Sequence, residues 1–343
     1  MRYRTLLAIA IAAVAAIAAQ TVGAQPPAPP TAAPPVAGVA QDALQLQVML
    51  DRAGFSPGVI DGRMGANTRR ALTLLRENGG GNDQVPPLTT YTITADDERG
   101  PYGPVPSDLV EQAELETLGY QSVVEALAER FHTTPALLER LNPGAAFREG
   151  EQIQVPNVIP LVVPIETVII PATPAPESAR RQHTNTGERT AGTSGASPER
   201  DPILDRPDVV VSVSKEASAL TVRDGSDTVV FFAPVTTGSE RDPLPIGEWR
   251  VTGIHIAPKF HYNPELFWDA DPSHSKATIQ PGPNNPVGLV WIDLSKEHYG
   301  IHGTPEPSAI GRTQSHGCVR LTNWDALKLS GMVKPGTRVI FTK

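Results

Sequence analysis

Two segments of low complexity limit what this chain of 343 residues can fold into. Residues 25–40 read QPPAPPTAAPPVAGVA, and residues 172–206 are rich in Pro, Ala, Ser, Thr and Arg. Because neither composition can bury an apolar core, we expect both to be linkers, the second covering residues 159–206. The remaining length suits two or three modules rather than one large core.

The first 24 residues have the features of a secretory signal peptide. Arg2 and Arg4 supply a positive start, residues 6–19 are an apolar run, and residues 22–24 are small, as cleavage requires. The run is shorter than the roughly 20 residues that span a bilayer, and an uncleaved anchor is the alternative. We therefore expect an exported protein that is not a membrane protein after cleavage.

The net charge and the single cysteine limit the classes of function that this chain can have. The formal net charge is −8, and the signal peptide would remove two positive charges, which argues against nucleic acid as a partner. Cys318 is the single cysteine. Because an exported protein meets an oxidising compartment, an unpaired thiol there is either reactive or buried and inert.

Residues 41–80 are predicted to form a small helical bundle. Two amphipathic patterns flank a D-G-x-x-G turn, and their apolar positions are Leu46, Met49, Leu50, Ala53, Ala71, Leu72 and Leu75. The region resembles the three-helix peptidoglycan-binding domain, whose DGxxG…T…A pattern is carried here by Asp61, Gly62, Gly65, Thr68 and Ala71. The resemblance implies glycan binding, with a spacer role as the alternative, and Asp61 and Gly62 are expected to shape the turn.

Residues 90–158 are predicted to follow a strand-helix-helix-strand order. YTIT at 91–94 alternates as a strand, two helical patterns cover 122–131 and 134–144, and GEQIQVP at 150–156 closes as a second strand. Pro135 suits the first turn of the second helix. This βααβ order resembles a LysM module, another peptidoglycan-binding unit, although an acidic, Pro-containing insertion after the first strand departs from that pattern.

Residues 207–343 are predicted to be mainly β. Short strands recur at regular spacing, two of them around an Asp224-Gly225 turn, which indicates a β-sandwich or barrel. One short helix interrupts the strands soon after Cys318. It is expected to begin with a capping box formed by Thr322 and Asp325.

The stretch SHGC at 315–318 suits a thiol nucleophile. Gly317 makes a sharp turn possible before Cys318, and the following helix would direct its positive end toward the thiolate. A histidine nearby, His302 or His316, could accept the thiol proton, and His302 on a neighbouring strand is the better placed. We therefore expect the pKa of the Cys318 thiol to lie below its ordinary value.

The pattern PGPNNPVGLVWIDLS…YGIHGT…IG…SHGCVRL…DA resembles the L,D-transpeptidase catalytic domain of the YkuD type across residues 209–342. Upstream, TGSERDPLPIGEWRV resembles the family segment TG…TPxGxF, with Leu244-Pro245 in place of Thr-Pro. The resemblance implies a periplasmic, cell-wall-associated peptidoglycan enzyme that needs neither cofactor nor metal. Its partners would be the stem peptides and the glycan of peptidoglycan.

The family resemblance also assigns roles. Cys318 would attack the third residue of a stem tetrapeptide, release D-alanine and form a thioester, which an amine then converts to a cross-link. His302 would be the base, and the N–H groups of Gly317 and Cys318 the oxyanion donors. Arg320 would bind a substrate carboxylate or form a structural ion pair.

The remaining candidates support the site. His316 would hold the loop or assist catalysis, and Ser315 would orient His302 or fix the turn. The segment that contains Phe260, Tyr262, Phe267 and Trp268 would form a lid, as in the family, or simply a packed loop.

Three other readings remain open. Water in place of the amine would make the enzyme an L,D-carboxypeptidase or a hydrolase of lipoprotein–peptidoglycan links. Zinc held by His298, His302, His316 and Cys318 would make it a metallohydrolase, although no acidic base accompanies the H-x-x-x-H pair. A non-catalytic wall-binding protein is the third reading.

Overall fold

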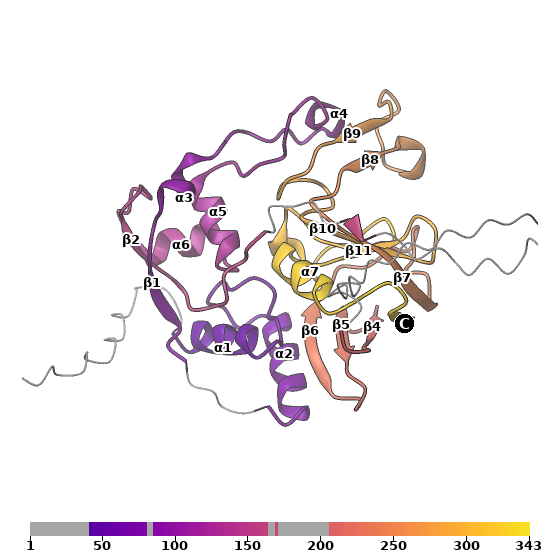
Figure 1. The fold of residues 1–343 in the computed structure, drawn as a ribbon, viewed down its shortest axis with the longest axis horizontal. Coiled ribbons are helices and arrows are strands. Elements are labelled where there is room, and N and C mark those ends of the chain that lie inside the picture. Colours follow the sequence, from indigo (N-terminus) through magenta and orange to yellow (C-terminus); the bar gives the residue numbers. More distant parts are fainter. Residues whose placement is uncertain (1–40, 81–84, 164–168, 171–205) are drawn as a thin grey trace, which may run out of the picture. The chain divides into compact units, whose positions relative to one another are not determined.

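The computed structural model describes residues 41–80, 85–163, 169–170 and 206–343 (Figure 1). The predicted signal peptide, the first linker and most of the second linker lie outside the described residues. Within the described ranges, no helix combines the length and the hydropathy that a membrane span requires.

Residues 41–80, here called the helical segment, contain α1 (Gln41–Arg52) and α2 (Ala66–Glu77). The buried side chain of Gln47 accepts from the N–H of Gly62 and donates to the Asp61 carboxylate and the Thr68 hydroxyl. Asp61 also accepts from the N–H of Arg63, and Gly62 has a φ of 71°. Asp61 and Gly62 therefore shape the turn, as predicted.

Residues 85–163, here called the βααβ segment, place two helices between two paired strands. β1 (Leu88–Thr92) runs antiparallel to β2 (Gln152–Pro156), and between them lie α5 (Val123–Arg130) and α6 (Pro135–Leu141). The hydroxyls of Ser122 and Thr134 cap these two helices, and Pro135 occupies a first-turn position. The insertion after β1 adds the short helices α3 (Ala95–Arg99) and α4 (Leu109–Gln112).

The C-terminal domain, residues 206–343, is mainly β. Eight of its strands form one sheet in the order β12-β11-β10-β7-β13-β4-β5-β6, β3 from the preceding segment pairs with β7 as the ninth described strand, and β8 and β9 form a separate pair. The strands are β3 (Ile169–Ile170), β4 (Val210–Ser214), β5 (Ala219–Arg223), β6 (Val229–Pro234), β7 (Gly247–Ile256), β8 (Phe260–Tyr262), β9 (Ala277–Ile279), β10 (Val290–Leu294), β11 (Gly300–His302), β12 (Val319–Arg320) and β13 (Arg338–Thr342). The short helices are η1 (Pro264–Leu266), η2 (Pro307–Ala309) and α7 (Asn323–Ser330). β3 lies within residues 159–206, which were expected to be a linker. Part of that range therefore pairs with the sheet of the C-terminal domain.

A long strand joins the two halves of this sheet. The first half of β7 pairs with β13, and its second half pairs with β10. Apolar side chains from both halves, including Val213, Phe231, Ile254 and Ile301, belong to one core cluster together with Leu329 of α7. A β-sandwich was expected, and the two halves of the sheet do enclose one buried interior. They are connected through β7, which belongs to both halves.

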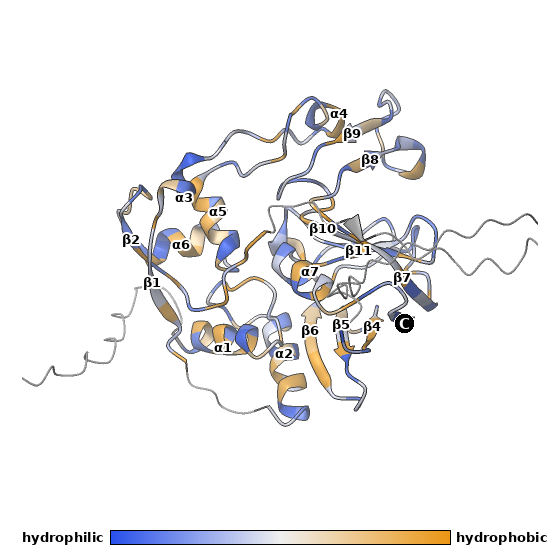
Figure 2. Ribbon diagram, in the orientation of Figure 1, coloured by the Kyte–Doolittle hydropathy of each residue, from blue (hydrophilic) through white to orange (hydrophobic). Residues whose placement is uncertain are grey.

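The helical segment shares its apolar core with the C-terminal domain instead of forming a separate module. Phe55 and Phe232 belong to one buried cluster, and the backbone of Phe232 exchanges hydrogen bonds with Gly54 and Ser56 at 2.9 and 2.8 Å. Figure 2 shows β6 in hydrophobic colours and α2 with hydrophobic and hydrophilic parts, and apolar residues of both pack in this cluster. Separate modules were expected from the sequence. The structure differs because the apolar face of β6 must be shielded from water, and the helical segment packs against it.

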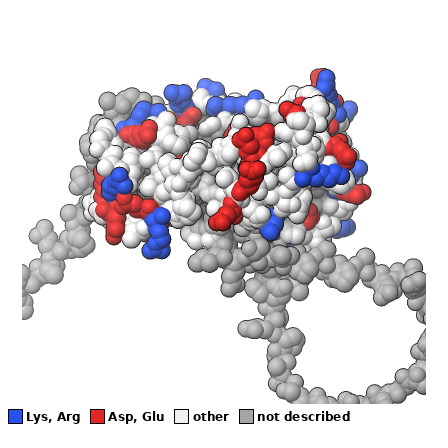
Figure 3. All heavy atoms as spheres, turned by 90° about the horizontal axis from the view of Figure 1, so that it is seen from above, with Lys and Arg blue, Asp and Glu red and all other residues white. Residues whose placement is uncertain are grey.

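Charged side chains of both signs lie on the surface. On the face drawn in Figure 3, Lys and Arg side chains lie among Asp and Glu side chains, without an extended basic patch over the described residues of that face.

Candidate functional site

Two parallel strands bring the main candidate residues together. β11 pairs with β12 so that His302 lies opposite Arg320, and Cys318 directly precedes β12. Side chains two residues apart on a strand share a face, so Cys318 and Arg320 point to the side on which His302 lies. All three line one cavity of about 1360 Å³.

The His302 ring is buried and neutral. Its Nδ1 lies 2.7 Å from the carbonyl oxygen of Gly303. A carbonyl only accepts, so Nδ1 carries the proton and Nε2 keeps its lone pair. Burial, with the positive charge of Arg320, lowers the pKa of His302 to about 3. The Trp291 ring stacks on the imidazole at 5.2 Å between centroids and fixes its orientation.

Cys318 is half-buried, and its Sγ lies 3.8 Å from the carbonyl oxygen of His298. Burial raises the pKa of the thiol above its ordinary value, although a backbone hydrogen bond from Gly300 and the charge of Arg320 act in the opposite direction. The expectation of an acidic thiol is therefore wrong. Helix α7 begins after Thr322, as the sequence predicted, but the burial of the thiol, which the sequence did not reveal, acts against its ionisation.

The turn before Cys318 depends on Gly317 and Ser315. Gly317 has a φ of 106°, and a Cβ at this position would lie 2.7 Å from the ring of Tyr299. The hydroxyl of Ser315 donates to the carbonyl of Cys318 at 2.6 Å, and its backbone bonds to Thr237. Of the two roles considered for Ser315, the contacts match fixing of the turn.

The Arg320 guanidinium lacks a full set of partners. Its Nε is buried and has no hydrogen-bond acceptor among the described residues. Burial also lowers the pKa of this guanidinium, while the nearby Cys318 thiol and Glu306 raise it. A buried donor without a partner costs free energy, so a ligand carboxylate in the cavity would be stabilised here.

His316 holds the aromatic segment over the cavity. Its Nε2 lies 2.8 Å from Oδ1 of Asp269, and its ring contacts those of Phe267 and Trp268. Arg241 covers the Trp268 ring at 4.3 Å. These contacts match the loop-holding role considered for His316.

Phe260 and Tyr262 belong to the same aromatic segment. They lie on β8, which pairs with β9, and they pack with Phe267 through tilted and edge-on ring contacts. Three of the four aromatic residues expected in a lid, all except Trp268, line the cavity.

The insertion of the βααβ segment also reaches this cavity, which sequence reasoning missed. Asp108 accepts from Nε2 of His274 at 2.9 Å, and Nδ1 of His274 contacts the Tyr262 hydroxyl at 3.0 Å. The N–H of Leu118 donates to the carbonyl of Pro281. The insertion was recognisable only as a departure from a pattern, and nothing in its composition indicated a contact with the lid.

The zinc ligands considered from the sequence do not gather. Among the described residues, no three side chains of His, Cys, Asp or Glu approach one another closely enough to hold a metal ion. His298 is exposed and lies 3.5 Å from its neighbour Glu297. His316 is bonded to Asp269.

Known proteins match the C-terminal domain. The L,D-transpeptidase catalytic domain (YkuD) matches residues 207–341. "Putative L,D-transpeptidase YqjB" of Bacillus subtilis (strain 168) is 30% identical over 141 residues, which are 39% of this chain and 72% of that protein. "Putative L,D-transpeptidase YkuD" of Bacillus licheniformis is 54% identical over 63 residues, or 18% of this chain and 38% of that protein. The solved "L,D-transpeptidase from Mycobacterium smegmatis" has a TM-score of 0.32 and 20% identity, over 40% of this chain and 59% of that one.

Fold and site together define a mainly-β domain that holds a thiol, a neutral imidazole and a guanidinium in one cavity. The chain belongs to the L,D-transpeptidase family, since it matches 72% of the length of YqjB at 30% identity. It spans only 38% of the length of the Bacillus licheniformis relative.

Proposed function

We propose that this protein is a peptidoglycan L,D-transpeptidase. It would join stem peptides through a thioester on Cys318 and so take part in cell-wall biogenesis. The observation that carries the proposal is that the neutral imidazole of His302, held through Nδ1 by Gly303, lines the same cavity as the Cys318 thiol whose proton it would accept. Family membership supports the same reaction.

The first half of the reaction forms the thioester. Sγ of Cys318 attacks the carbonyl carbon of the third stem residue while Nε2 of His302 takes the thiol proton. The N–H groups of Gly317 and Cys318 donate to the oxyanion. The carbon–nitrogen bond then breaks, and His302 returns the proton to the departing amine of D-alanine.

The second half transfers the acyl group. An acceptor amine attacks the thioester carbon and gives a proton to His302, which protonates the sulfur as the carbon–sulfur bond breaks. A neutral thiol and a neutral imidazole suit this cycle, because each proton moves only when the sulfur attacks or leaves. Arg320 binds a carboxylate of the stem peptide through its unpaired donor.

We also propose that the protein acts in the periplasm and that its first two segments bind the wall. The positively charged start and apolar run favour export. The turn around Asp61 and the β1–β2 pair support the resemblance to peptidoglycan-binding and LysM modules, with wall glycan as the ligand.

Mass spectrometry of the intact protein tests the reaction. With a disaccharide tetrapeptide and no acceptor, the chain should gain the mass of the donor minus D-alanine. Cys318→Ala should gain nothing, and His302→Ala should acylate far more slowly. Arg69→Gln, on the exposed side of α2, is the matched control and should acylate at the rate of the parent protein.

An added acceptor peptide distinguishes the competing reactions. It should convert the adduct to a cross-linked dimer faster than water releases a tripeptide. Preferential hydrolysis at high acceptor concentration would make the protein a carboxypeptidase, and absence of any adduct would leave a wall-binding protein. Loss of acylation in EDTA with recovery in zinc would overturn the cysteine mechanism.

A further inference from the structure

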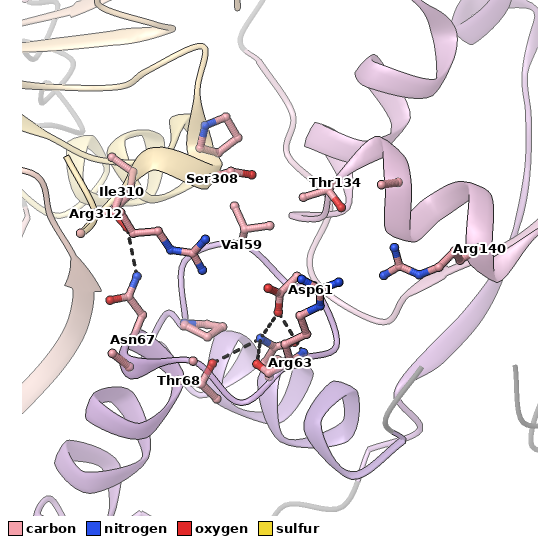
Figure 4. Close-up of a pocket in the computed structure, with 17 residues that line it drawn as sticks. Val59, Asp61, Arg63, Asn67, Thr68, Thr134, Arg140, Ser308, Ile310 and Arg312 are labelled. Atoms are coloured by element: carbon pink, nitrogen blue, oxygen red, sulfur yellow. Dashed lines mark hydrogen bonds between the residues drawn. The ribbon is translucent and has the colours of Figure 1, made fainter. Parts of the chain in front are cut away.

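A second cavity lies away from the thiol, where three parts of the chain meet. It has a volume of about 260 Å³ and is lined by the turn of the helical segment, by one side of α6, and by η2 with the loop that follows it (Figure 4). Cys318, His302 and Arg320 do not line it. We call it the junction pocket.

The walls of the junction pocket are fixed to one another by hydrogen bonds. Gln47 holds the turn at Asp61 and the side chain of Thr68. The amide of Asn67 donates to the carbonyl of Ile310 at 3.2 Å, which joins α2 to the loop after η2. Thr133 donates to the carbonyl of Ile60 at 2.6 Å, which joins the turn to the start of α6. The pocket is therefore preformed, and a ligand would not have to order its walls.

Three arginines from three separate elements surround this pocket. Arg63 comes from the turn, Arg140 from α6 and Arg312 from the loop after η2. In Figure 4, Arg312 and Arg140 point toward the middle from opposite sides, and Arg63 lies between them beside Asp61. No salt bridge among the described residues involves any of the three guanidinium groups. The pocket thus gathers positive charge in a chain whose net charge is −8.

Other groups of the junction pocket specify more than charge. Gly65 begins α2 without a side-chain cap, and Gly65 and Ala66 line the pocket, so the first N–H groups of the helix add donors on the same side. Asp61 is the single carboxylate among the lining residues and accepts from Gln47 and Arg63 through one oxygen, Oδ1. Its Oδ2 is the acceptor available to a ligand N–H or hydroxyl.

We propose that the junction pocket binds a peptide stem that carries a free carboxylate and N–H groups, as a second stem-peptide site separate from the thiol cavity. The carboxylate lies among Arg63, Arg140 and Arg312, and an N–H of the ligand donates to Asp61. An inorganic phosphate would match the arginines but has no N–H group for Asp61 and brings more negative charge toward it than a carboxylate does. The identity of the ligand rests on the proposed function, because that function brings stem peptides to this protein.

Calorimetric titration of the full chain as Cys318→Ala tests the proposal without turnover. The disaccharide tetrapeptide should bind at two sites per chain. Arg140→Gln with Arg312→Gln should remove one site or weaken it at least tenfold, because each charge-assisted hydrogen bond contributes to affinity. Arg69→Gln should leave both sites unchanged, and unchanged thermal unfolding should show that the arginine variants are folded.

Two further ligands test the chemistry. The tetrapeptide with all its carboxylates amidated should no longer bind at the arginine-dependent site. Inorganic phosphate, at a roughly 10-fold excess over the tetrapeptide, should not displace the tetrapeptide from that site. The proposal would be overturned if phosphate bound at the arginines and the tetrapeptide did not. It would also be overturned if the tetrapeptide bound at one site in both the parent protein and the arginine variant. If acylation of Cys318 fails while the arginine-dependent site remains, the proposed function falls and the pocket stands.

Discussion

The side-chain amide of Asn323 donates a hydrogen bond of 2.7 Å to Oε1 of Glu129, across 194 residues of the chain. Both side chains are buried. Oδ1 of Asn323 accepts from the N–H of Leu289 at 3.0 Å, directly before β10, and β10 pairs with the strand of His302. The βααβ segment therefore makes contact, through two side chains, with the sheet that carries the site.

We expect the burial of Glu129 to contribute a part of the stability that falls as pH rises from about 4.5 to 7. Burial raises the pKa of Glu129 to about 7 and that of Asp325 to about 6. In this window the two folded carboxyls keep protons that the unfolded chain has released, so their contribution to the free energy of unfolding decreases with pH. The lowered pKa of His302 acts in the opposite direction below about pH 6.5. For Glu129 the shift corresponds to a loss of roughly 3 kcal/mol. Glu129→Gln should therefore make the melting temperature fall less, or rise more, with pH between about 4.5 and 7, and an unchanged slope would contradict the assignment.

A fragment that begins near Arg206 should lose stability and activity. Removing the helical segment exposes Phe232 and takes the Ser56 hydroxyl, 2.8 Å away, from the buried Asp325. The separate modules expected from the sequence would instead leave this fragment folded and active on small substrates. Thermal unfolding and acylation of the fragment would test this, and parent-like values for both would refute the shared core.

Phe55→Ala isolates the contribution of that shared core. The side chain is buried at 4% exposure, so truncation should cost about 3–5 kcal/mol of unfolding free energy. Met64→Ala is the control, because Met64 is 41% exposed and should change stability by no more than about 0.5 kcal/mol. Urea unfolding of both variants measures the difference, and equal midpoints would exclude a core role for Phe55.

Alkylation of Cys318 by iodoacetamide should accelerate only at alkaline pH. Burial raises the thiol pKa above 9.0, and the charge of Arg320 lowers it. Replacing Arg320 with Gln should therefore move the midpoint of the rate profile to still higher pH, since it removes a charge that stabilises the thiolate. Free thiols have a pKa of about 8.5, so an alkylation rate that has already reached its plateau below about pH 8 would show that the thiol is acidic after all.

Breaking the pair of His316 and Asp269 should loosen the aromatic segment without removing the nucleophile. His316→Ala and Asp269→Ala should each raise KM a few-fold, as expected for a partly exposed hydrogen-bonded pair worth less than about 1 kcal/mol. The double variant should be no worse than either single one. Additive effects, or a large fall in kcat, would assign His316 a direct part in the reaction.

The candidate residues could be identified from the sequence because they lie in short local motifs. Cys318 after Gly317, His302 on a nearby strand and Thr322 as a helix cap are readable from a few neighbouring residues. The structure supports the turn through the φ of Gly317 and the cap through the bond from Asp325 N–H to Thr322. The pairing of β11 with β12 brings the short motifs together, as strands of one sheet do.

Tertiary structure alone decided the pKa values, the shared core and the junction pocket. The pKa of Cys318 depends on burial by residues distant in sequence, so local motifs predicted its direction wrongly. Phe55 packs with the cluster of Phe232, and the junction pocket gathers Arg63, Arg140 and Arg312. Each of these residues lies in a segment whose own sequence pattern is that of an exposed loop or an ordinary amphipathic helix. By itself, the sequence determined which residues carry reactive groups and where turns and strands occur. How water is excluded from those groups, and which distant charges face them, depends on the packing of the whole chain.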